Sequence, residues 1–348
     1  MANVVFVTDG SPLTQSVVHR VGYAAGYLEQ HGHQVRILYG REQTLVGRRF
    51  TRPRFSSWFR ALLMIPASDV LVIHRAGDPA TGAIAALAKW RRKRLVIDLD
   101  DAVYLNRNPL TISINYLLRS SELVTASSRA IANYARRCCQ NVQIMPAVVD
   151  TDLFTPRGGS RKTSVPTIGW LGDGRVHAEN LRVILNPLLD LAKRHKFRLK
   201  LVSALGNRKI YDVFKELERH VEVDYGLKQW VEISRIPDLI KDFDISVMPL
   251  VDTAYSRAKA GQKILESMSM GLPVVASAVG ENRFLLSHGS DGFLADSEEA
   301  WVRFLTELML DPELRERMGA EGRKKVMTKY SREVCGELFA RSLEALLP

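Results

Sequence analysis

The sequence predicts an α/β protein made of two doubly wound parallel sheets. Short apolar runs alternate with longer amphipathic segments along nearly the whole chain, and this is the order of strands and helices in such sheets. The chain has 348 residues, which is more than a single core usually holds. A stretch rich in Pro, Gly, Ser and charge interrupts the alternation near the middle, so we expect two domains.

The first series of elements lies before this interruption. Its expected strands have continuous apolar runs, which indicates burial on both faces. The strands are expected at residues 4–8, 34–39, 69–74, 94–99, 123–126 and 142–145, and the helices at residues 14–31, 80–90, 110–118 and 128–138. The linker is expected over Asp150–Pro166, which has no apolar period, and the first domain over residues 1–155.

A second series follows the linker, and we expect a second domain over residues 156–329. Its strands are expected at residues 167–171, 197–203, 221–225, 245–249, 274–276 and 291–294. Its helices are expected at residues 180–195, 210–220 and 237–243 and from near Lys259 to Gly271. The rest of the chain is helical in pattern, and residues 330–348 are expected to form a separate C-terminal helix.

The predicted helix that begins near Lys259 carries the most informative charges. Lys259, Lys263 and Glu266 are spaced i, i+4 and i+7, which places two ammonium groups and one carboxylate on one face. A buried strand follows directly, so this face should lie at the open end of a sheet, where α/β sheets bind ligands. The two lysines indicate a phosphate site in a cleft between the domains. The alternative is an exposed ion pair worth about 0.3 kcal/mol.

Composition excludes several classes of protein. Hydrophobic residues make up 46% of the chain and charged residues 25%, which is typical of a globular enzyme rather than a disordered chain. No window approaches the roughly 20 apolar residues of a membrane span. The N-terminus enters a strand without a secretion signal, so we expect a cytoplasmic protein. Cys138, Cys139 and Cys335 lack the spacing of a disulfide framework or a zinc site, and we interpret them as reduced.

The net charge of +11 is concentrated in the first half of the chain. Residues 1–157 hold 20 Lys and Arg against 11 Asp and Glu, whereas residues 158–348 hold 29 against 27. Residues 47–64 interleave Phe and Trp with five arginines, Arg48, Arg49, Arg52, Arg54 and Arg60. The run KWRRKR at residues 89–94 adds a second cluster. This mixture suits an anionic membrane surface; the alternative is a solvated face with ordinary core aromatics. Without a recognition motif, we expect no nucleic-acid partner.

Several motifs occur in an order and spacing that one fold would need. They are HGHQV at residues 31–35, VIDLDDAVY at 96–104, IMPAVVDTDLF at 144–154, IGWLG at 168–172, FDISVMPL at 243–250, AKAGQKILESMSMGLPVVASAVGENRFLL at 258–286, DGFLA at 291–295 and DPELRERMGAEGRKKV at 311–326. Together they resemble the GT-B-fold glycosyltransferases of group 1, also labelled GT4. The resemblance implies an acceptor-binding Rossmann-like first domain, a nucleotide-sugar-binding second domain and a C-terminal helix that crosses back to the first domain.

The resemblance also implies a donor site. The family has two glutamates eight positions apart; here the second is Glu266, which implies a ribose contact, and the first position is Ala258. The loop that grips the diphosphate in the family reads GDGRVHAEN here. The residues implied in donor binding are Gly10, Gly172, Arg175, His177, Lys259, Lys263, Glu266, Gly280, Glu281 and Asn282. Cations and backbone N–H groups are the chemistry that holds a diphosphate.

Carboxylates at the end of the predicted strand 94–99 are the candidate catalytic groups. By the resemblance, Asp101 aligns with the family's aspartate and Asp100 with its histidine, so Asp100 is expected nearest the reaction. Carboxylates there can orient an acceptor hydroxyl or accept its proton; the alternative is that they cap the next helix. His74, at the end of the preceding strand and followed by Arg75, is the third candidate.

We therefore expect a glycosyltransferase that moves a sugar from a nucleoside-diphosphate donor to an acceptor hydroxyl with retention, in polysaccharide, lipopolysaccharide or other glycoconjugate biosynthesis. No cofactor or metal is expected, because no Asp-x-Asp pair lies on a donor loop. The basic first domain favours a lipid-linked acceptor and a peripheral position on the inner face of a membrane. Ala258 and the altered loop keep a second interpretation open, a catalytically silent protein that binds a sugar nucleotide or a partner.

Overall fold

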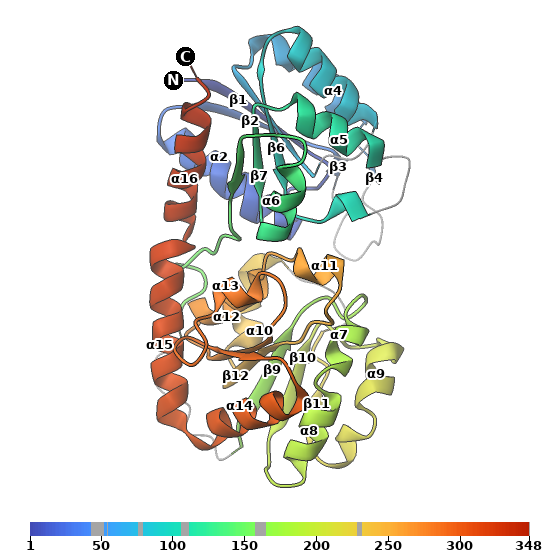
Figure 1. The fold of residues 1–348 in the computed structure, drawn as a ribbon, viewed down its shortest axis with the longest axis vertical. Helices are drawn as coiled ribbons and strands as arrows, with labels where there is room; N and C mark the ends of the chain where they lie inside the picture. Colours follow the sequence, from blue (N-terminus) through green and yellow to red (C-terminus); the bar gives the residue numbers. More distant parts are fainter. Residues whose placement is uncertain are drawn as a thin grey trace. The chain divides into compact units, whose positions relative to one another are not determined.

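The computed structural model describes residues 1–42, 52–53, 55–75, 79–105, 111–156, 165–227 and 232–347. The chain forms two compact units (Figure 1). Unit 1 contains Met1–Val148, the short segment Arg257–Ala260 and Arg332–Pro348; unit 2 contains Val149–Ser256 and Gly261–Ser331. The predicted α/β class with two doubly wound parallel sheets is confirmed.

Unit 1 is built on a parallel sheet of six strands in the order β2-β1-β5-β6-β7-β8. The strands are β1 (Asn3–Thr8), β2 (Gln34–Tyr39), β5 (Val70–His74), β6 (Arg94–Leu99), β7 (Leu123–Ala126) and β8 (Val142–Ile144). The central strands are almost completely buried, because both faces are covered by helices. The strand order reverses direction between β1 and β5, and the carboxyl ends of strands near such a point are where α/β sheets bind ligands.

Helices cover both faces of this sheet. They are α1 (Gln15–Val17), the π-helical turn η1 (Val18–Gly22), α2 (Tyr23–Gln30), α3 (Phe55–Met64), η2 (Ile65–Ala67), α4 (Pro79–Trp90), η3 (Val103–Leu105), α5 (Thr111–Ser120), α6 (Arg129–Ala135) and α16 (Arg332–Glu344). Two short strands, β3 (Arg41–Glu42) and β4 (Arg52–Pro53), pair antiparallel beside the sheet. The C-terminal helix α16 packs on α2 within unit 1 (Figure 1). Phe339 stacks on Phe6 of β1, so α16 covers one face of the core.

Unit 2 is also built on a parallel sheet of six strands, in the order β11-β10-β9-β12-β13-β14. Its strands are β9 (Thr167–Leu171), β10 (Arg198–Val202), β11 (Glu222–Asp224), β12 (Ile245–Met248), β13 (Val274–Ser277) and β14 (Phe293–Ala295). Its helices are α7 (Ala178–Arg182), α8 (Leu185–Ala192), α9 (Arg208–Phe214), η4 (Leu217–Arg219), η5 (Ile233–Arg235), α10 (Ile236–Ile240), α11 (Ala254–Arg257), α12 (Gln262–Ser269), α13 (Asn282–Leu285), α14 (Glu298–Leu310) and α15 (Pro312–Lys329). Gly169 in β9 has no room for a side chain, because the Phe243 ring lies against it.

The start of the lysine-bearing helix differs from the prediction. Helix α12 begins at Gln262, not near Lys259, because Gly261 takes a left-handed conformation with φ of +71° and ends the regular backbone there. Its predicted end is confirmed, since Gly271 has φ of +70° directly after the last turn. Lys259 therefore lies outside the helix, and the expected common face of Lys259, Lys263 and Glu266 is wrong.

The basic aromatic stretch 47–64 is only partly described. Arg48, Arg49 and Arg54 lie outside the described residues, and Arg52 is described only as part of strand β4. Arg60 is exposed on α3. Among the helices that the structure describes, none is both long and apolar enough to cross a membrane.

Candidate functional site

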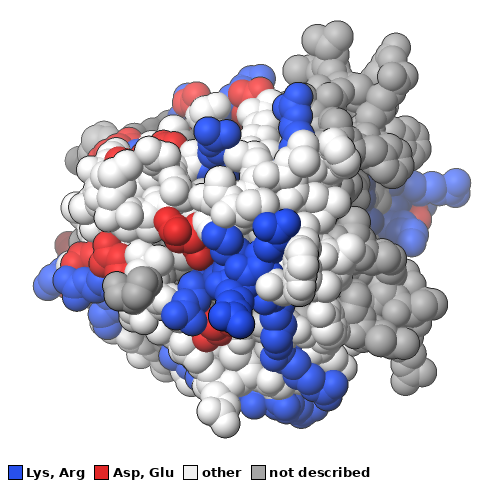
Figure 2. Space-filling view, turned by 90° about the horizontal axis from the view of Figure 1, so that it is seen from above, with Lys and Arg blue, Asp and Glu red and all other residues white. Residues whose placement is uncertain are grey.

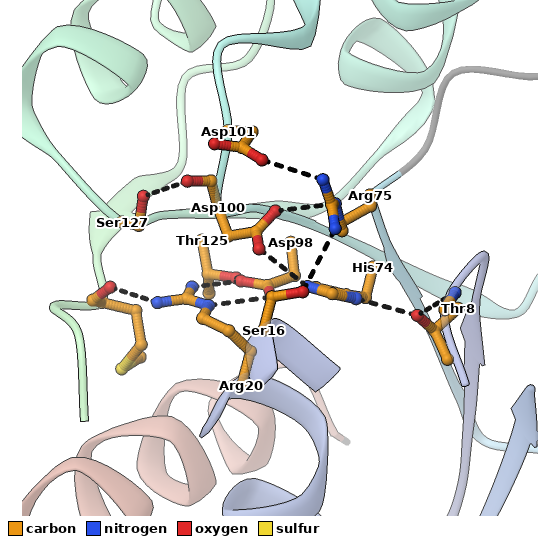
Figure 3. A network of polar contacts seen from close by, with 12 residues as sticks. Thr8, Ser16, Arg20, His74, Arg75, Asp98, Asp100, Asp101, Thr125 and Ser127 are labelled. Atoms are coloured by element: carbon orange, nitrogen blue, oxygen red, sulfur yellow. Dashed lines mark hydrogen bonds and ion pairs between the residues drawn. The ribbon is translucent and has the colours of Figure 1, made fainter. Parts of the chain in front are cut away.

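Polar side chains gather at the carboxyl edge of the unit 1 sheet, where β1, β5 and β6 end side by side (Figure 3). The parallel register places Thr8 beside His74 and His74 beside Asp98, so one layer across three strands is polar. Asp100 and Asp101 follow directly after β6. The structure thus brings the predicted catalytic residues His74, Asp100 and Asp101 together at one edge.

Asp98 is held by a buried arginine. The Arg20 guanidinium binds the Asp98 carboxylate through two hydrogen bonds. Nε donates to Oδ2 at 3.0 Å, and Nη2 donates to Oδ1. Thr125 Oγ1 donates to Oδ1 at 2.5 Å, and Arg20 Nη1 donates to the Met145 carbonyl. Arg20 projects from the π-helical turn η1, a rare geometry that is frequent at functional sites. With its charge matched and its oxygens bonded, Asp98 is a structural anchor of this edge.

His74 and Asp100 form the next layer. The fully buried His74 ring is hydrogen-bonded through Nδ1 to Thr8 Oγ1 at 2.9 Å, and its Nε2 lies 3.5 Å from Asp100 Oδ2. The Asp100 backbone carbonyl accepts a hydrogen bond from Ser127 Oγ at 3.0 Å. Burial alone would raise the pKa of Asp100, but the neighbouring His74 side chain and the guanidinium of Arg75 hold that pKa well below its usual range. Asp100 is therefore an ionised carboxylate over the working pH range.

Asp101 is the carboxylate most open to solvent. The exposed fraction of the side chain rises from 5% at Asp98 to 10% at Asp100 and 35% at Asp101. Arg75 Nη2 donates to Asp101 Oδ2 at 2.8 Å, and its Nη1 donates to Ser16 Oγ at 3.2 Å. Arg75 has φ of +56°, a strained conformation for a residue with a side chain. Burial and the negative charge of Asp100 raise the pKa of Asp101.

The short segment Arg257–Ala260 belongs to the same unit as these carboxylates. Ala258 is buried in the unit 1 core, and its carbonyl accepts a hydrogen bond from Ser128 Oγ at 2.8 Å. The positive charge of Lys259 acts on Asp101 and opposes the rise in the pKa of that carboxyl, while burial lowers the pKa of Lys259 itself. Lys259 thus lies in the same unit as Asp101, whereas Lys263 lies in unit 2.

Gly10 also lies in unit 1, although the resemblance implied a contact with the donor. It follows β1, and its backbone N–H donates to Thr8 Oγ1 at 3.2 Å. A side chain at this position would collide with Val17, which explains the glycine. The contact of Gly10 with the donor stays a prediction.

The loop after β9 carries the expected diphosphate contacts of unit 2. A side chain at Gly172 would collide with the Trp170 ring, which explains the glycine. Arg175 Nη2 lies 2.5 Å from Asp173 Oδ2, and this hydrogen bond raises the pKa of Arg175 and lowers that of Asp173. His177 Nδ1 is hydrogen-bonded to Asn180 Nδ2 at 2.9 Å. Within this loop the positive charge of Arg175 is therefore largely offset by its own neighbour.

Helix α12 supplies a paired cation and carboxylate. Lys263 Nζ lies 3.1 Å from Glu266 Oε2, and Gln262 Nε2 donates to Oε1 of the same carboxylate at 3.2 Å. Glu266 is completely buried, so the pair is held in a low-dielectric setting. The residue before α12, Gly261, lies against α13, since a side chain there would collide with Leu285.

The remaining donor candidates lie beside α12 and are fixed by hydrogen bonds between loops. Gly280 has φ of +54°, and Glu281 and Asn282 begin α13, both buried. Asn282 Nδ2 donates to the Ser277 carbonyl at 3.0 Å at the end of β13. Asn180 Oδ1 accepts from the Val251 backbone N–H at 2.9 Å, which joins α7 to the loop after β12. Loops after β9, β12 and β13 therefore form one edge of the unit 2 sheet.

Comparison with known proteins finds one matching family model. Residues 165–311 match the family model of the glycosyl transferases group 1. This part of the chain, less than half of its length, is therefore similar to the group 1 glycosyl transferases. The matched range includes Gly172, Arg175, Lys263 and Glu266. The resemblance inferred from the motifs is thereby confirmed.

Relatives in sequence are distant. The chain is 28% identical over 214 residues to the D-inositol 3-phosphate glycosyltransferase of Pseudarthrobacter chlorophenolicus, a match over 58% of this chain and 48% of that protein. It is 28% identical over 160 residues to the glycosyltransferase 1 domain-containing protein 1 of Xenopus tropicalis, over 44% of this chain and 45% of that protein. The chain thus spans about half the length of the curated relatives it matches.

Solved structures share the whole fold. Sucrose-phosphate synthase of Thermosynechococcus elongatus superimposes with a TM-score of 0.74 at 15% identity, over 99% of both chains. Anabaena HepE, solved in complex with UDP, gives a TM-score of 0.72 at 15% identity, over 99% of this chain and 100% of that one. At this identity the likeness concerns the fold, and the GT-B prediction is confirmed.

Several residues of the unit 1 edge were missed by reasoning from sequence. Arg20, Thr125 and Ser127 come from helices and strands far from β6 in the chain, and no local pattern connects them to it. One signal was present: Asp98 is a charged residue inside an apolar strand, and a buried charge requires a partner. Which residue provides it depends on the fold.

The described residues contain no group of three or more His, Cys, Asp and Glu side chains that could hold a metal ion. That catalysis needs no metal stays a prediction.

Proposed function

We propose that the protein transfers a sugar from a nucleoside-diphosphate donor to an acceptor hydroxyl, with retention of the anomeric configuration. The observation that carries this proposal is the graded row of carboxylates at the unit 1 edge, with Asp101 held by Arg75 and open to solvent. The match of residues 165–311 to the group 1 family model supports sugar transfer. The complexes of Anabaena HepE with UDP and with UDP-glucose support a nucleotide sugar as donor.

We assign donor binding to unit 2. Glu266 is a buried carboxylate that can accept hydrogen bonds from the two ribose hydroxyls, while Lys263 beside it has an ammonium group for the diphosphate. The backbone N–H groups around Gly280 add donors of the kind that phosphate oxygens accept. Arg175 must give up its hydrogen bond with Asp173 before it can bind the diphosphate. We therefore propose that Arg175 contributes less to donor affinity than Lys263.

We assign the acceptor and its proton to unit 1. The acceptor oxygen bonds to the anomeric carbon on the face that the diphosphate leaves. The bond from that carbon to the β-phosphate oxygen breaks, and its electron pair leaves with the nucleoside diphosphate. The hydroxyl proton passes to the Asp101 carboxylate, whose raised pKa makes it the better base. Alignment favours Asp100, but its lowered pKa and buried side chain suit a fixed negative charge that orients His74 and Arg75.

The acceptor is proposed to be a lipid-linked glycan or glycolipid, in the assembly of a polysaccharide, lipopolysaccharide or other glycoconjugate. The excess of Lys and Arg in unit 1 supports this class, because lipid-linked acceptors lie at anionic membrane surfaces.

The catalytically silent alternative is favoured by one specific observation. Where relatives have an acidic donor-sugar contact, this chain has Ala258, which is packed in the unit 1 core. Such a protein would bind a sugar nucleotide without turning it over.

A two-step experiment tests the proposal. Thermal shift of the full chain with UDP-, GDP- and ADP-sugars finds the donor, because binding to the native state raises Tm. Release of nucleoside diphosphate from that donor is then measured with a membrane extract as the source of acceptor. Lys263→Ala should weaken donor binding by roughly 10- to 100-fold, the value of a hydrogen bond to a charged group.

Each outcome has a definite meaning. If no nucleotide sugar raises Tm, the donor assignment is wrong. If a donor binds but no nucleoside diphosphate is released, the protein is the silent form. Unchanged donor affinity in Lys263→Ala would remove Lys263 from the diphosphate site.

A further inference from the structure

The turn between α4 and β6 gathers positive charge at the amino edge of the unit 1 sheet, away from the carboxylates. We call residues Lys89–Arg94 the basic turn. It contains five cations, Lys89, Arg91, Arg92, Lys93 and Arg94, and no Asp or Glu. Figure 2 looks down on the end of unit 1 where α4 ends, and shows Lys and Arg side chains gathered there with few carboxylates among them.

The backbone fixes this cluster in one place. Arg92 N–H donates to the Lys89 carbonyl and Lys93 N–H to the Ala88 carbonyl, both at 2.9 Å, and Arg92 has φ of +56°. The chain therefore reverses within one helical turn and enters β6 at Arg94. All of the five cations except the half-buried Lys93 are exposed.

The cations of the basic turn form no ion pair with any carboxylate that the structure describes. Asp69 and Glu122 lie at the same edge, but their carboxylates are oriented toward backbone donors: Asp69 Oδ2 accepts from the Asn3 N–H and Glu122 Oε2 from the Leu95 N–H. A surface of this kind attracts an anionic partner.

Exposed apolar side chains accompany the cations. Trp90 is 72% exposed, with the Arg91 guanidinium 4.7 Å from the centre of its ring. Helix α3 packs beside α4 and exposes Phe59 at 63% and Leu63 at 65%, one helical turn apart. Arg60 is exposed between them. Tryptophan, leucine and phenylalanine beside arginines match the chemistry of a bilayer interface, where rings sit among headgroups and cations meet phosphates.

We propose that α3 and the basic turn form a docking surface for an anionic lipid bilayer. Helix α3 lies in the chain between β4 and β5. It begins on the side of the carboxyl edge, where β2 ends, and leads through η2 to the start of β5 at the amino edge. Its ten residues therefore extend over about 15 Å from the carboxyl edge toward the amino edge. A bilayer along α3 touches the basic turn at one end and passes beside the carboxyl edge at the other.

This orientation gives the docking surface a functional consequence. It brings the sugar of a membrane-embedded acceptor to the edge that carries Asp101, and this part of the inference rests on the proposed function. Nucleic acid is the less suitable partner. Phe59 and Leu63 on one face of α3 form an apolar surface, whereas nucleic-acid binding needs side chains that read a groove or aromatic rings on which bases stack.

Vesicle flotation with the full chain tests the docking surface. Vesicles of phosphatidylcholine with about 30% phosphatidylglycerol should bind the protein, and vesicles of phosphatidylcholine alone should not. The variant Arg91→Gln/Lys93→Gln/Arg94→Gln should bind about 100-fold more weakly, because each cation near an anionic surface contributes about fivefold. Trp90→Ser should weaken binding by about tenfold even at high salt, since its contribution is apolar.

A matched control removes the same charge elsewhere. Arg182→Gln/Lys193→Gln/Arg194→Gln in unit 2 replaces three exposed cations that are paired with Glu179 or Asp190. It should keep vesicle binding and folding unchanged. Equal binding by both triple variants, or equal binding to the neutral vesicles, would overturn the proposal. Tighter binding of a single-stranded RNA than of the anionic vesicles at equal salt would instead assign the surface to nucleic acid.

The outcome is separable from that of the proposed function. Thermal shift by the nucleotide sugar should be the same in wild type and in the basic-turn variant, because the donor residues are in unit 2. Vesicle binding without release of nucleoside diphosphate would support the docking surface and contradict the proposed transferase activity. Release of nucleoside diphosphate without vesicle binding would support the transferase activity and contradict the docking surface.

Discussion

The carboxyl edges of the two parallel sheets carry opposite chemistry. In unit 1 three carboxylates lie at the end of β6, and each is more exposed than the one before. In unit 2 the carboxylate of Glu266 is completely buried beside Lys263. The fold therefore brings side chains to the edge, while burial and the nearest cation decide whether a carboxylate anchors the structure, binds a ligand or accepts a proton.

The largest expected effect concerns Asp101, the most exposed of the three carboxylates at the unit 1 edge. Asp101→Asn keeps the shape of the side chain but removes the proposed base, so kcat/KM should fall by about 10²- to 10⁴-fold with donor affinity unchanged. Steady-state kinetics and donor titration measure the two quantities. If Asp100→Asn loses turnover while Asp101→Asn keeps it, the role belongs to Asp100, as the alignment favoured.

Asp98, the most buried of these three carboxylates, should affect the free energy of unfolding. Arg20→Met leaves the Asp98 carboxylate buried without its cation and should lower the free energy of unfolding by about 3–5 kcal/mol. Denaturant unfolding measures this. Arg20→Met combined with Asp98→Leu should be clearly more stable than Arg20→Met alone, because no charge stays buried. Equal loss in both variants would show that the Arg20 bonds to the Met145 and Pro146 carbonyls are responsible.

The smallest effect is a shift of a pH profile. If Asp101 accepts the proton, kcat/KM rises as pH passes the pKa of Asp101, which lies above the usual carboxyl value. Lys259 holds that pKa down, so Lys259→Met should move this acidic limb to higher pH. Asp100→Asn removes a negative charge that raises the pKa and should move the limb to lower pH.

Lys263→Met provides the control for this shift, because Lys263 is in the other unit and should leave the limb in place while weakening donor binding. A Lys259→Met variant with a higher KM for the donor and an unmoved limb would return Lys259 to the diphosphate site.

Local sequence patterns were sufficient for the order along the chain of the strands in the two six-stranded sheets and for the edge on which the candidates lie, but they missed the helices α3 and α11. Asp100 and Asp101 were found because they follow an apolar strand, and Glu266 because it belongs to a motif. The start of α12 was misplaced, since helical spacing continues through Gly261 and only the left-handed backbone there interrupts it. The partner of Asp98 was not found, because Arg20 lies 78 residues away.

By itself the sequence determined the α/β class, the resemblance to the group 1 family and the strand ends that bear charge, because these depend on periodicity and on short motifs. Only the tertiary structure decided which cation meets which carboxylate. It buried Asp98 with Arg20, placed Lys259 in the unit of Asp101 rather than in that of Lys263, and left the basic turn without an ion pair among the described residues. The physical reason is that burial and electrostatic pairing are set by residues distant in the chain, and those two quantities determine the pKa and the accessibility of each group.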